Sequence, residues 1–240
     1  KTLLVEREPK LGGDCLHFGC VPSKTLIRSA QLYHEMKHAE SFGLPPVDLP
    51  PVDFSKVAAR IRSVIDTIQE HDSEERFCQL GAKVVFGEAE FVDDREVKVD
   101  GVSHTANTWV LATGSSPSAP PIPGLDGVDY ITNKEVFSLD RLPSSLTVLG
   151  AGPIAIEMAQ SFARFGSQVT VIQRSEQILS KEDPDLAGMV QQALEEEGIR
   201  IITGSQVESV SAEGGEKIVS LRTKSGEQHH VRSEQLLVGL

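Results

Sequence analysis

One short segment, residues 149–155, restricts the possible folds of this chain more than any other. It reads Leu-Gly-Ala-Gly-Pro-Ile-Ala, which matches the pattern G-x-G-x-x-G/A, between an apolar run and a stretch with helical spacing. The two glycines permit a tight strand-to-helix turn and let a pyrophosphate approach the amides at the start of the helix. We therefore predict a dinucleotide site that uses Gly150, Gly152 and Ala155; the alternative is an ordinary strand–helix turn.

Two apolar runs recur in the same order in each half of the chain, which predicts two similar nucleotide-binding halves. Residues 2–7 resemble residues 168–174, and residues 109–114 resemble residues 235–240. We expect all four runs to be strands. Residues 146–203 alternate strand, helix, strand, helix and strand, a pattern typical of a parallel doubly wound sheet.

Local patterns predict the elements between these runs. Apolar residues at helical spacing indicate helices over residues 26–36 and 54–68. The prolines of residues 44–52 indicate a loop, and a strand is expected over residues 83–86. The pair Asp100-Gly101 is typical of a hairpin turn.

Composition argues against several kinds of partner. The 240 residues include 35 acidic and 23 basic side chains, and the formal net charge is −12. Such a surface repels phosphate backbones and anionic lipid, so we expect neither nucleic acid nor a membrane as a partner. The 3 cysteines are too few for a secreted disulfide framework, and we expect a reducing, cytoplasmic location.

The residues at the ends of two predicted strands indicate which nucleotides bind. An NAD site usually has an acidic residue at the end of the second strand, but here the strand ends in Gln173-Arg174. The Arg174 guanidinium could hold a 2′-phosphate, so we predict NADPH, with NADH still possible; the alternative is a solvated surface arginine. Glu6 is at the equivalent place in the first half and is expected to bind an unphosphorylated ribose, as in FAD.

Residues 12–24, Gly-Gly-Asp-Cys-Leu-His-Phe-Gly-Cys-Val-Pro-Ser-Lys, contain a close cysteine pair. In a straight helix, Cys15 and Cys20 would be too far apart for a disulfide, with Cα atoms roughly 8.7 Å apart. Gly19 and Pro22 supply irregular backbone that could bring them within range. We expect the start of the following helix, together with Lys24, to stabilise a thiolate.

Two alternatives for the cysteines stay open at this point. Cys15, Cys20, His17 and His34 could form a zinc site, although their spacing is unusual and the chain has no second cysteine pair. The two thiols could also be purely structural. Cys78 is expected to be a buried small hydrophobe at the end of a helix.

These motifs resemble those of the flavin-dependent pyridine nucleotide–disulfide oxidoreductases, the class I family that includes dihydrolipoamide dehydrogenase, glutathione reductase and mercuric reductase. Residues 12–24 are similar to the redox-disulfide segment, and residues 150–157 to the nicotinamide-nucleotide fingerprint. Residues 87–89 are similar to the segment that contacts the FAD adenine, and residues 112–114 to the flavin-contacting turn. The resemblance extends over nearly the whole chain.

The resemblance implies an α/β fold with tandem Rossmann-like FAD- and NAD(P)-binding domains in three layers, truncated at both ends. Residues 1–143 would be a partial FAD-binding domain with the redox-disulfide segment, and residues 144–240 the NAD(P)-binding domain. Members of the family also have a C-terminal dimerisation domain. We therefore expect the parent protein to be a homodimer through a domain that this chain does not contain.

The resemblance also implies roles for individual residues. Cys15 would be the interchange thiol that meets substrate, and Cys20 the thiol near the flavin. Lys24 would lie near the flavin and pair with Glu157, for which the alternative is a solvated helix residue. Hydride would pass from NADPH to FAD, and electrons would pass to the Cys15–Cys20 disulfide and then to substrate. The substrate would be a small-molecule disulfide, a dithiol or a metal ion.

The catalytic residues implied are thus Cys15, Cys20, Lys24 and Glu157, and no resident metal site is predicted. The cofactor-binding residues implied are Glu6, Gly12, Gly13, Asp14, Gly19, Lys24, Ala89, Ala112, Thr113, Gly114, Gly150, Gly152, Ala155, Glu157, Arg174, Val207 and Gly239.

Some positions differ from the family pattern. Asp14 replaces the usual Thr and brings a negative charge near the FAD pyrophosphate, unless it is protonated or turned away. His17 replaces the common Asn and could tune the Cys15 thiolate or simply face solvent. Residues 21–24 together with Arg174 favour the mercuric reductase branch over the dihydrolipoamide dehydrogenase branch. The alternative function is a redox-inactive FAD/NAD(P)-binding fragment.

Overall fold

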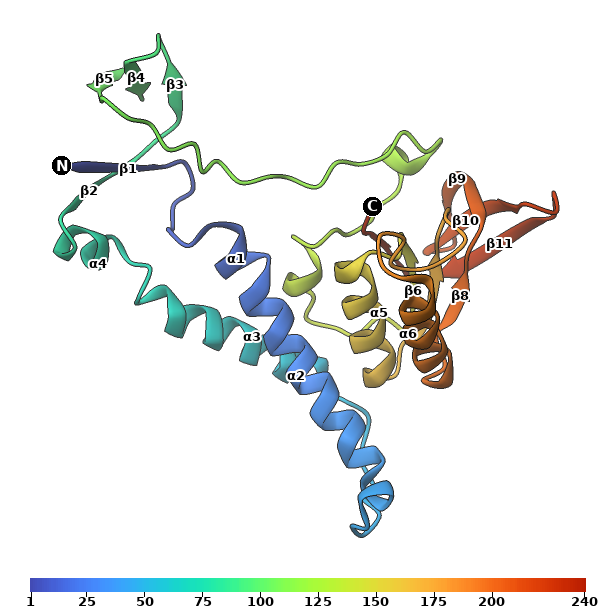
Figure 1. Ribbon diagram of the computed structural model, residues 1–240. Helices are drawn as coiled ribbons and strands as arrows, with labels where there is room; N and C mark the ends of the chain where they lie inside the picture. The colour runs from blue at the N-terminus through green and yellow to red at the C-terminus, as the bar shows by residue number, and fades with distance from the viewer. The chain divides into compact units, whose positions relative to one another are not determined.

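The computed structural model describes residues 1–240, and each of its two structural units combines two stretches of the chain (Figure 1). The first unit consists of Lys1–Pro22 and Arg62–Ser116, and the second of Ser23–Ile61 and Pro117–Leu240. The boundary predicted after residue 143 lies within the second unit. It stays a prediction about the cofactor-binding domains.

The first unit contains two small sheets. The first sheet pairs β1 (Thr2–Glu6) in parallel with β2 (Ala82–Phe86), as expected of two apolar runs that end near polar turns. The second sheet is antiparallel and consists of β3 (Ala89–Phe91), β4 (Glu96–Val99) and β5 (Val102–Thr105). Asp100 and Gly101 join β4 to β5 with φ values of 47° and 83°. Two positive φ values are typical of a tight hairpin turn, so the hairpin prediction is confirmed.

The strand predicted over residues 109–114 does not form. Residues 108–122 have no regular secondary structure, and the Val110 and Leu111 side chains are 86% and 73% exposed. Apolar character alone does not make a strand, because a strand also needs a partner for its backbone hydrogen bonds. No strand pairs with residues 109–114. The matching run in the second half does form a strand, β12 (Gln235–Val238).

Two short helices belong wholly to the first unit, α1 (Gly13–His17) and α4 (Glu74–Gln79). The Ser73 hydroxyl caps α4 by accepting a hydrogen bond from the Arg76 N–H. Cys78 lies on α4 and is exposed, so the prediction that it is a buried hydrophobe is wrong. The reason is that no residue of α4 is buried, and the helix therefore offers no core for a small apolar side chain.

The second unit is built on a four-stranded parallel sheet in the order β12-β6-β7-β8. Helices α5 and α6 connect its successive strands, which is the strand–helix alternation predicted for residues 146–203. The elements are β6 (Ser145–Leu149), α5 (Pro153–Phe165), β7 (Gln168–Ile172), α6 (Pro184–Glu196) and β8 (Arg200–Ile202). The α/β fold prediction is confirmed.

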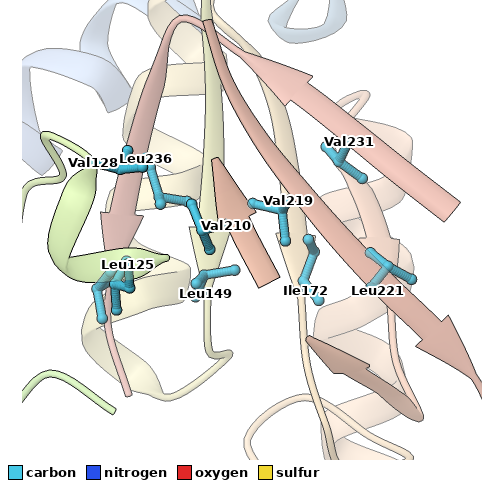
Figure 2. Close-up of a cluster of buried hydrophobic side chains, with 10 residues drawn as sticks. Leu125, Val128, Leu149, Ile172, Val210, Val219, Leu221, Val231 and Leu236 are labelled. Atoms are coloured by element: carbon cyan, nitrogen blue, oxygen red, sulfur yellow. The ribbon is translucent and has the colours of Figure 1, made fainter. Parts of the chain in front are cut away.

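An antiparallel sheet that was not predicted covers one face of this parallel sheet. It consists of β9 (Ser205–Glu213), β10 (Glu216–Thr223) and β11 (Gln228–Ser233). Figure 2 shows its apolar side chains directed toward those of the parallel sheet. Val219, Leu221 and Leu236 are completely buried in this cluster. Burying an aliphatic side chain of this size contributes roughly 1.5–3 kcal/mol, so the cluster is a main source of stability for this unit.

The helices α2 (Cys20–Lys37) and α3 (Phe54–Gln69) have residues in both units. Within the second unit, Phe54 of α3 packs against Phe162 and Phe165 of α5, with ring centroids 5.7 and 5.8 Å apart. On α2, Leu26 and Ala30 are buried, as the helical spacing predicted. Three short 3₁₀ helices, η1 (Ala39–Phe42), η2 (Leu125–Gly127) and η3 (Val136–Ser138), complete the fold. None of the helices combines the length and the apolar character needed to cross a bilayer.

Glu234, between β11 and β12, fastens the segment that leads into β6. Its carboxylate accepts hydrogen bonds from the Ser144 N–H and hydroxyl, both 2.8 Å long, and forms an ion pair with Arg141. The Glu234 N–H in turn donates to the Ser145 hydroxyl oxygen at 2.9 Å. The hydrogen bond from Arg141 and those from Ser144 lower the pKa of Glu234 to about 2.

We predict that Glu234→Gln lowers the free energy of unfolding by about 1–2 kcal/mol at neutral pH, a value reduced for partial solvent exposure. Because the folded-state pKa is lowered, the carboxylate stabilises the fold above its ordinary pKa, and this contribution is lost as pH falls toward about 2. Urea unfolding at neutral and acidic pH measures the difference. Glu182→Gln, an exposed change, serves as the control. Equal stability of Glu234→Gln and the unchanged protein at neutral pH would contradict the prediction.

Candidate functional site

The turn after β6 brings two predicted cofactor residues together. Gly150 has a φ of +99° and donates its N–H to the Ile172 carbonyl oxygen at 2.9 Å. A Cβ on Gly150 would lie 2.5 Å from the Gly239 carbonyl oxygen, and the Gly239 N–H donates to the Leu149 carbonyl oxygen at 2.9 Å. Only glycine allows this approach, so the turn keeps β6 and the end of β12 in close backbone contact.

The start of α5 presents open backbone amides. Gly152 is the N-cap residue, no side chain caps the helix, and Pro153 occupies the first turn, where an N–H is not needed. A Cβ on Gly152 would meet nothing within 4 Å, whereas Ala155 is 1% exposed and lies against Gly239. The uncapped amides and the positive end of the helix dipole therefore fit the pyrophosphate of a nicotinamide dinucleotide.

The end of β7 leaves the predicted phosphate ligand accessible. Arg174 is exposed and has no ion-pair partner. Nearby in the chain, Glu176 forms an ion pair with Lys224. The guanidinium of Arg174 can therefore bind an external anion. Val207, also predicted to bind cofactor, is partly buried on β9 and packs against the hydrophobic cluster.

Lys24 and Glu157 form an ion pair within the second unit. The Lys24 Nζ donates to Oε1 of Glu157, joining α2 to α5. Their side chains are 60% and 36% exposed, so the pair contributes little to stability. Glu157 is thus more than a solvated helix residue. The role of the pair beside a flavin stays a prediction.

The two cysteines meet where α1 ends and α2 begins. The chain breaks its helical path at Phe18 and Gly19, and the Phe18 N–H donates to the Asp14 carbonyl oxygen at 2.8 Å. A Cβ on Gly19 would lie 2.9 Å from that same carbonyl oxygen and 3.2 Å from the Cys15 Cα. Glycine at this position therefore lets the start of α2, which is Cys20, return to α1.

Cys15 and Cys20 are both thiols in the structure, and their side chains are hydrogen-bonded. This hydrogen bond is the main cause that raises the pKa of Cys15, followed by partial burial and by the negative charges of Cys20 and Asp72. The pKa shift at Cys15 is opposite in direction to thiolate stabilisation, and the expectation that the start of α2 stabilises a thiolate stays a prediction. His17 does not contact Cys15 in a way that shifts its pKa; the His17 Nε2 hydrogen-bonds to the Leu11 carbonyl oxygen at 3.0 Å.

The zinc alternative has no support in the geometry. No group of three or more His, Cys, Asp or Glu side chains gathers closely enough to hold a metal ion. The four residues considered for that site are therefore not assembled. His34 is instead partly buried, which lowers its pKa.

The residues predicted to hold FAD cluster in the first unit around β1. Gly12 and Gly13 have φ values of +117° and +56°, and a Cβ on Gly12 would lie 2.4 Å from the Leu16 side chain, whereas the space at Gly13 is open. Glu6, at the end of β1, accepts a hydrogen bond from the Glu8 N–H at 2.9 Å. An open glycine backbone after a strand that ends in a carboxylate fits the ribose and phosphate of a dinucleotide.

The segment expected to contact the FAD adenine lies directly beside Glu6. Gly87 donates its N–H to the Glu6 carbonyl oxygen at 2.9 Å. A Cβ on Gly87, whose φ is +146°, would lie 2.5 Å from an Asp100 carboxylate oxygen. Ala89 follows as the exposed first residue of β3.

Asp14 lies next to the predicted flavin-contacting turn. Its Oδ2 accepts a weak hydrogen bond from the Ser115 N–H at 3.4 Å and would be 3.2 Å from a Cβ on Gly114. Ala112 and Thr113 are exposed. The structure therefore brings Asp14 next to Gly114, with the carboxylate turned toward the Ser115 amide.

Two residues near Cys15, Gln69 and Asp72, were missed by sequence reasoning. Gln69 donates to the Leu11 carbonyl oxygen at 2.9 Å, and the Asp72 charge contributes to the raised pKa of Cys15. Gln69 and Asp72 are more than fifty positions from Cys15 in the chain, and no local pattern marks either of them.

A close cysteine pair together with two glycine-rich nucleotide turns is the combination of features typical of flavoprotein disulfide reductases. The chain belongs to the pyridine nucleotide-disulphide oxidoreductase family, whose model matches residues 1–240. It is 36% identical over 238 residues to a mercuric reductase of Bacillus cereus, covering 99% of this chain and 37% of that protein. It is 35% identical over 212 residues to a dihydrolipoyl dehydrogenase of Bacillus subtilis, covering 86% of this chain and 46% of that protein.

Solved structures agree with this assignment. The HOCl-induced flavoprotein disulfide reductase RclA of Escherichia coli matches with a TM-score of 0.83 and 26% identity, over 99% of this chain and 50% of that one. LpdA of Mycobacterium tuberculosis matches with a TM-score of 0.84 and 25% identity, over 100% and 52% of the two chains. The chain therefore spans about half the length of the structures, and less than half of the two sequence relatives.

We predict that Gly150→Ala destabilises the protein by about 2–4 kcal/mol, because a Cβ there requires a left-handed backbone and collides with the Gly239 carbonyl. Gly188→Ala is the matched control. Gly188 lies in α6 with nothing near its Cβ position, so this change should raise stability by roughly 0.5–1 kcal/mol. Thermal unfolding distinguishes the two variants, and equal effects would show that the close approach is not needed.

Proposed function

We propose that the protein is an FAD-dependent NAD(P)H:disulfide or metal-ion oxidoreductase that uses Cys15 and Cys20 as its redox pair. The observation that carries this proposal is the hydrogen bond between the two sulfurs. Two thiols that already touch need only a small rearrangement to form a disulfide. The glycine-rich turns at residues 12–13 and 150–155, which fit dinucleotides, also support it.

The chemistry divides between the cofactors and the chain. Bound FAD would accept a hydride from the nicotinamide and pass two electrons on to the protein. The Cys15–Cys20 disulfide takes up those two electrons and two protons and becomes two thiols. One thiol then attacks a substrate disulfide as its thiolate, and the second cysteine displaces the product and closes the protein disulfide again.

Cys15 is suited to be the attacking thiol and Cys20 the one nearer the flavin. Cys20 is the first residue of α2, one helical turn before Lys24, which is held by Glu157. Cys15 is exposed on the short helix α1, so a substrate can reach its side chain.

We propose NADPH as the electron donor and a small molecule as the acceptor. Arg174 supports NADPH because its guanidinium is exposed and has no ion-pair partner. The relatives named mercuric reductase and dihydrolipoyl dehydrogenase support a metal ion, a disulfide or a dithiol as substrate. The mercuric reductase branch is favoured by residues 21–24 together with Arg174.

Anaerobic reduction of the full-length protein with NADPH tests the redox pair. We expect NADPH to add two reactive thiols and a long-wavelength thiolate–flavin absorbance band, and Cys20→Ser to abolish both. Cys78→Ser is the control, because Cys78 is an exposed cysteine on α4 outside the pair. If NADPH produces neither new thiols nor the absorbance band, the cysteine pair exchanges no electrons, and the alternative of a redox-inactive nucleotide-binding fragment holds.

Arg174→Glu tests the choice of nucleotide. We expect the Kd for NADPH to rise about 10- to 100-fold, because a carboxylate repels the 2′-phosphate, while the Kd for NADH stays the same or falls. Titration followed by nicotinamide fluorescence gives both values. Arg60→Glu makes the same charge change at another exposed arginine and should alter neither. An unchanged NADPH affinity in Arg174→Glu would remove the argument for NADPH.

A further inference from the structure

The carbonyl oxygen of Leu11, just before α1, accepts two side-chain hydrogen bonds. His17 Nε2 lies 3.0 Å away and Gln69 Nε2 lies 2.9 Å away. Leu11 is 4% exposed, and a carbonyl oxygen has two lone pairs, so the two donors fill its capacity without water. The loop is thereby fastened both to the last residue of α1 and to the last residue of α3.

The orientation of the Gln69 amide is fixed by its surroundings. Its nitrogen also donates to the Asp72 carbonyl oxygen at 3.3 Å. Because the Leu11 and Asp72 carbonyl oxygens can only accept, the amide nitrogen and not the amide oxygen has to lie on their side. Its Oε1 is buried and has no hydrogen-bond partner. A buried acceptor without a donor is unfavourable, so the side chain keeps this orientation because of the two bonds made by its nitrogen.

The same turn at the end of α3 also affects the sulfur electrostatically. Besides Cys20, Asp72 is the charged group that acts on Cys15. Gln69 holds the backbone of Asp72 and the loop before α1 with one amide group. Helix α1 has only five residues, too few to be stable without external support.

We propose that Gln69 and His17 are positioning residues that clamp the Leu11 carbonyl and thereby hold the Cys15 sulfur against Cys20. This inference rests on the proposed function of the cysteine pair. His17 thus acts by position, through a hydrogen bond that its ring can donate whether it is neutral or protonated. Loss of either donor lets α1 move, which lowers the frequency with which the two sulfurs meet.

The test measures Cys15 directly in the full-length protein. In Gln69→Met, the equilibrium constant for forming the Cys15–Cys20 disulfide in a dithiothreitol redox buffer should fall at least about threefold. Alkylation of Cys15 near neutral pH, followed by mass spectrometry, should become about threefold faster, because the hydrogen bond that disfavours the thiolate is weakened. Its pH profile should shift toward lower pH.

Three further variants make the result specific. His17→Leu should reproduce both effects, and it carries the test if Gln69→Met does not fold. His17→Gln keeps an N–H donor at a similar position and should behave like the unchanged protein. Gln192→Met, at an exposed position of α6, is the matched control and should have no effect. Combining Gln69→Met with His17→Leu should add little, because both act on one carbonyl.

Unchanged alkylation of Cys15 in both Gln69→Met and His17→Leu overturns the clamp. If the unchanged protein forms no Cys15–Cys20 disulfide, the proposed function fails. A faster alkylation of Cys15 in the two variants would still support the clamp in that case, because alkylation does not require the disulfide. The two readouts therefore separate the two failures.

Discussion

The site depends on a close approach of backbone that a single Cβ would prevent. Gly19 leaves the space through which the first residue of α2 returns to α1, so that Cys15 and Cys20 come into hydrogen-bonding contact. In the second unit, Gly150 allows an equivalent approach between the end of β6 and Gly239. In both places a glycine without a Cβ lets two backbone segments approach closely. In the first place this approach positions the two cysteines, and in the second it positions the nucleotide-binding turn.

The second unit supplies a firmly packed base for its own nucleotide turn. Its parallel sheet is covered on one face by the antiparallel strands β9–β11, and the apolar side chains of the cluster between them are almost completely buried. The aromatic contacts of Phe54 with α5 fix α3 on the same body, and the pair formed by Lys24 and Glu157 joins α2 to it. The packing of α5 therefore holds the helix in place without a capping side chain at its start. The amides at that start remain open for a nucleotide.

Much of this arrangement could be predicted from the sequence because the signals are local. The glycine turn at residues 150–155 and the cysteine segment at residues 12–24 are each recognised from consecutive residues. The strand at residues 109–114 was predicted wrongly, since pairing depends on a partner that apolar character does not reveal. The exposure of Cys78 and the contacts of Gln69 were missed for the same reason. Both depend on which distant segments pack beside the helix, and the adjacent residues in the sequence do not reveal this.

The small sheet formed by β1 and β2 has a further consequence. Each strand is paired on one side only, and Val110 and Leu111 of the same unit are exposed and pair with no strand. A strand with unsatisfied N–H and C=O groups along its edge is a template for strand addition. Each strand of this sheet therefore keeps one edge whose backbone N–H and C=O groups are open to pairing with a further strand.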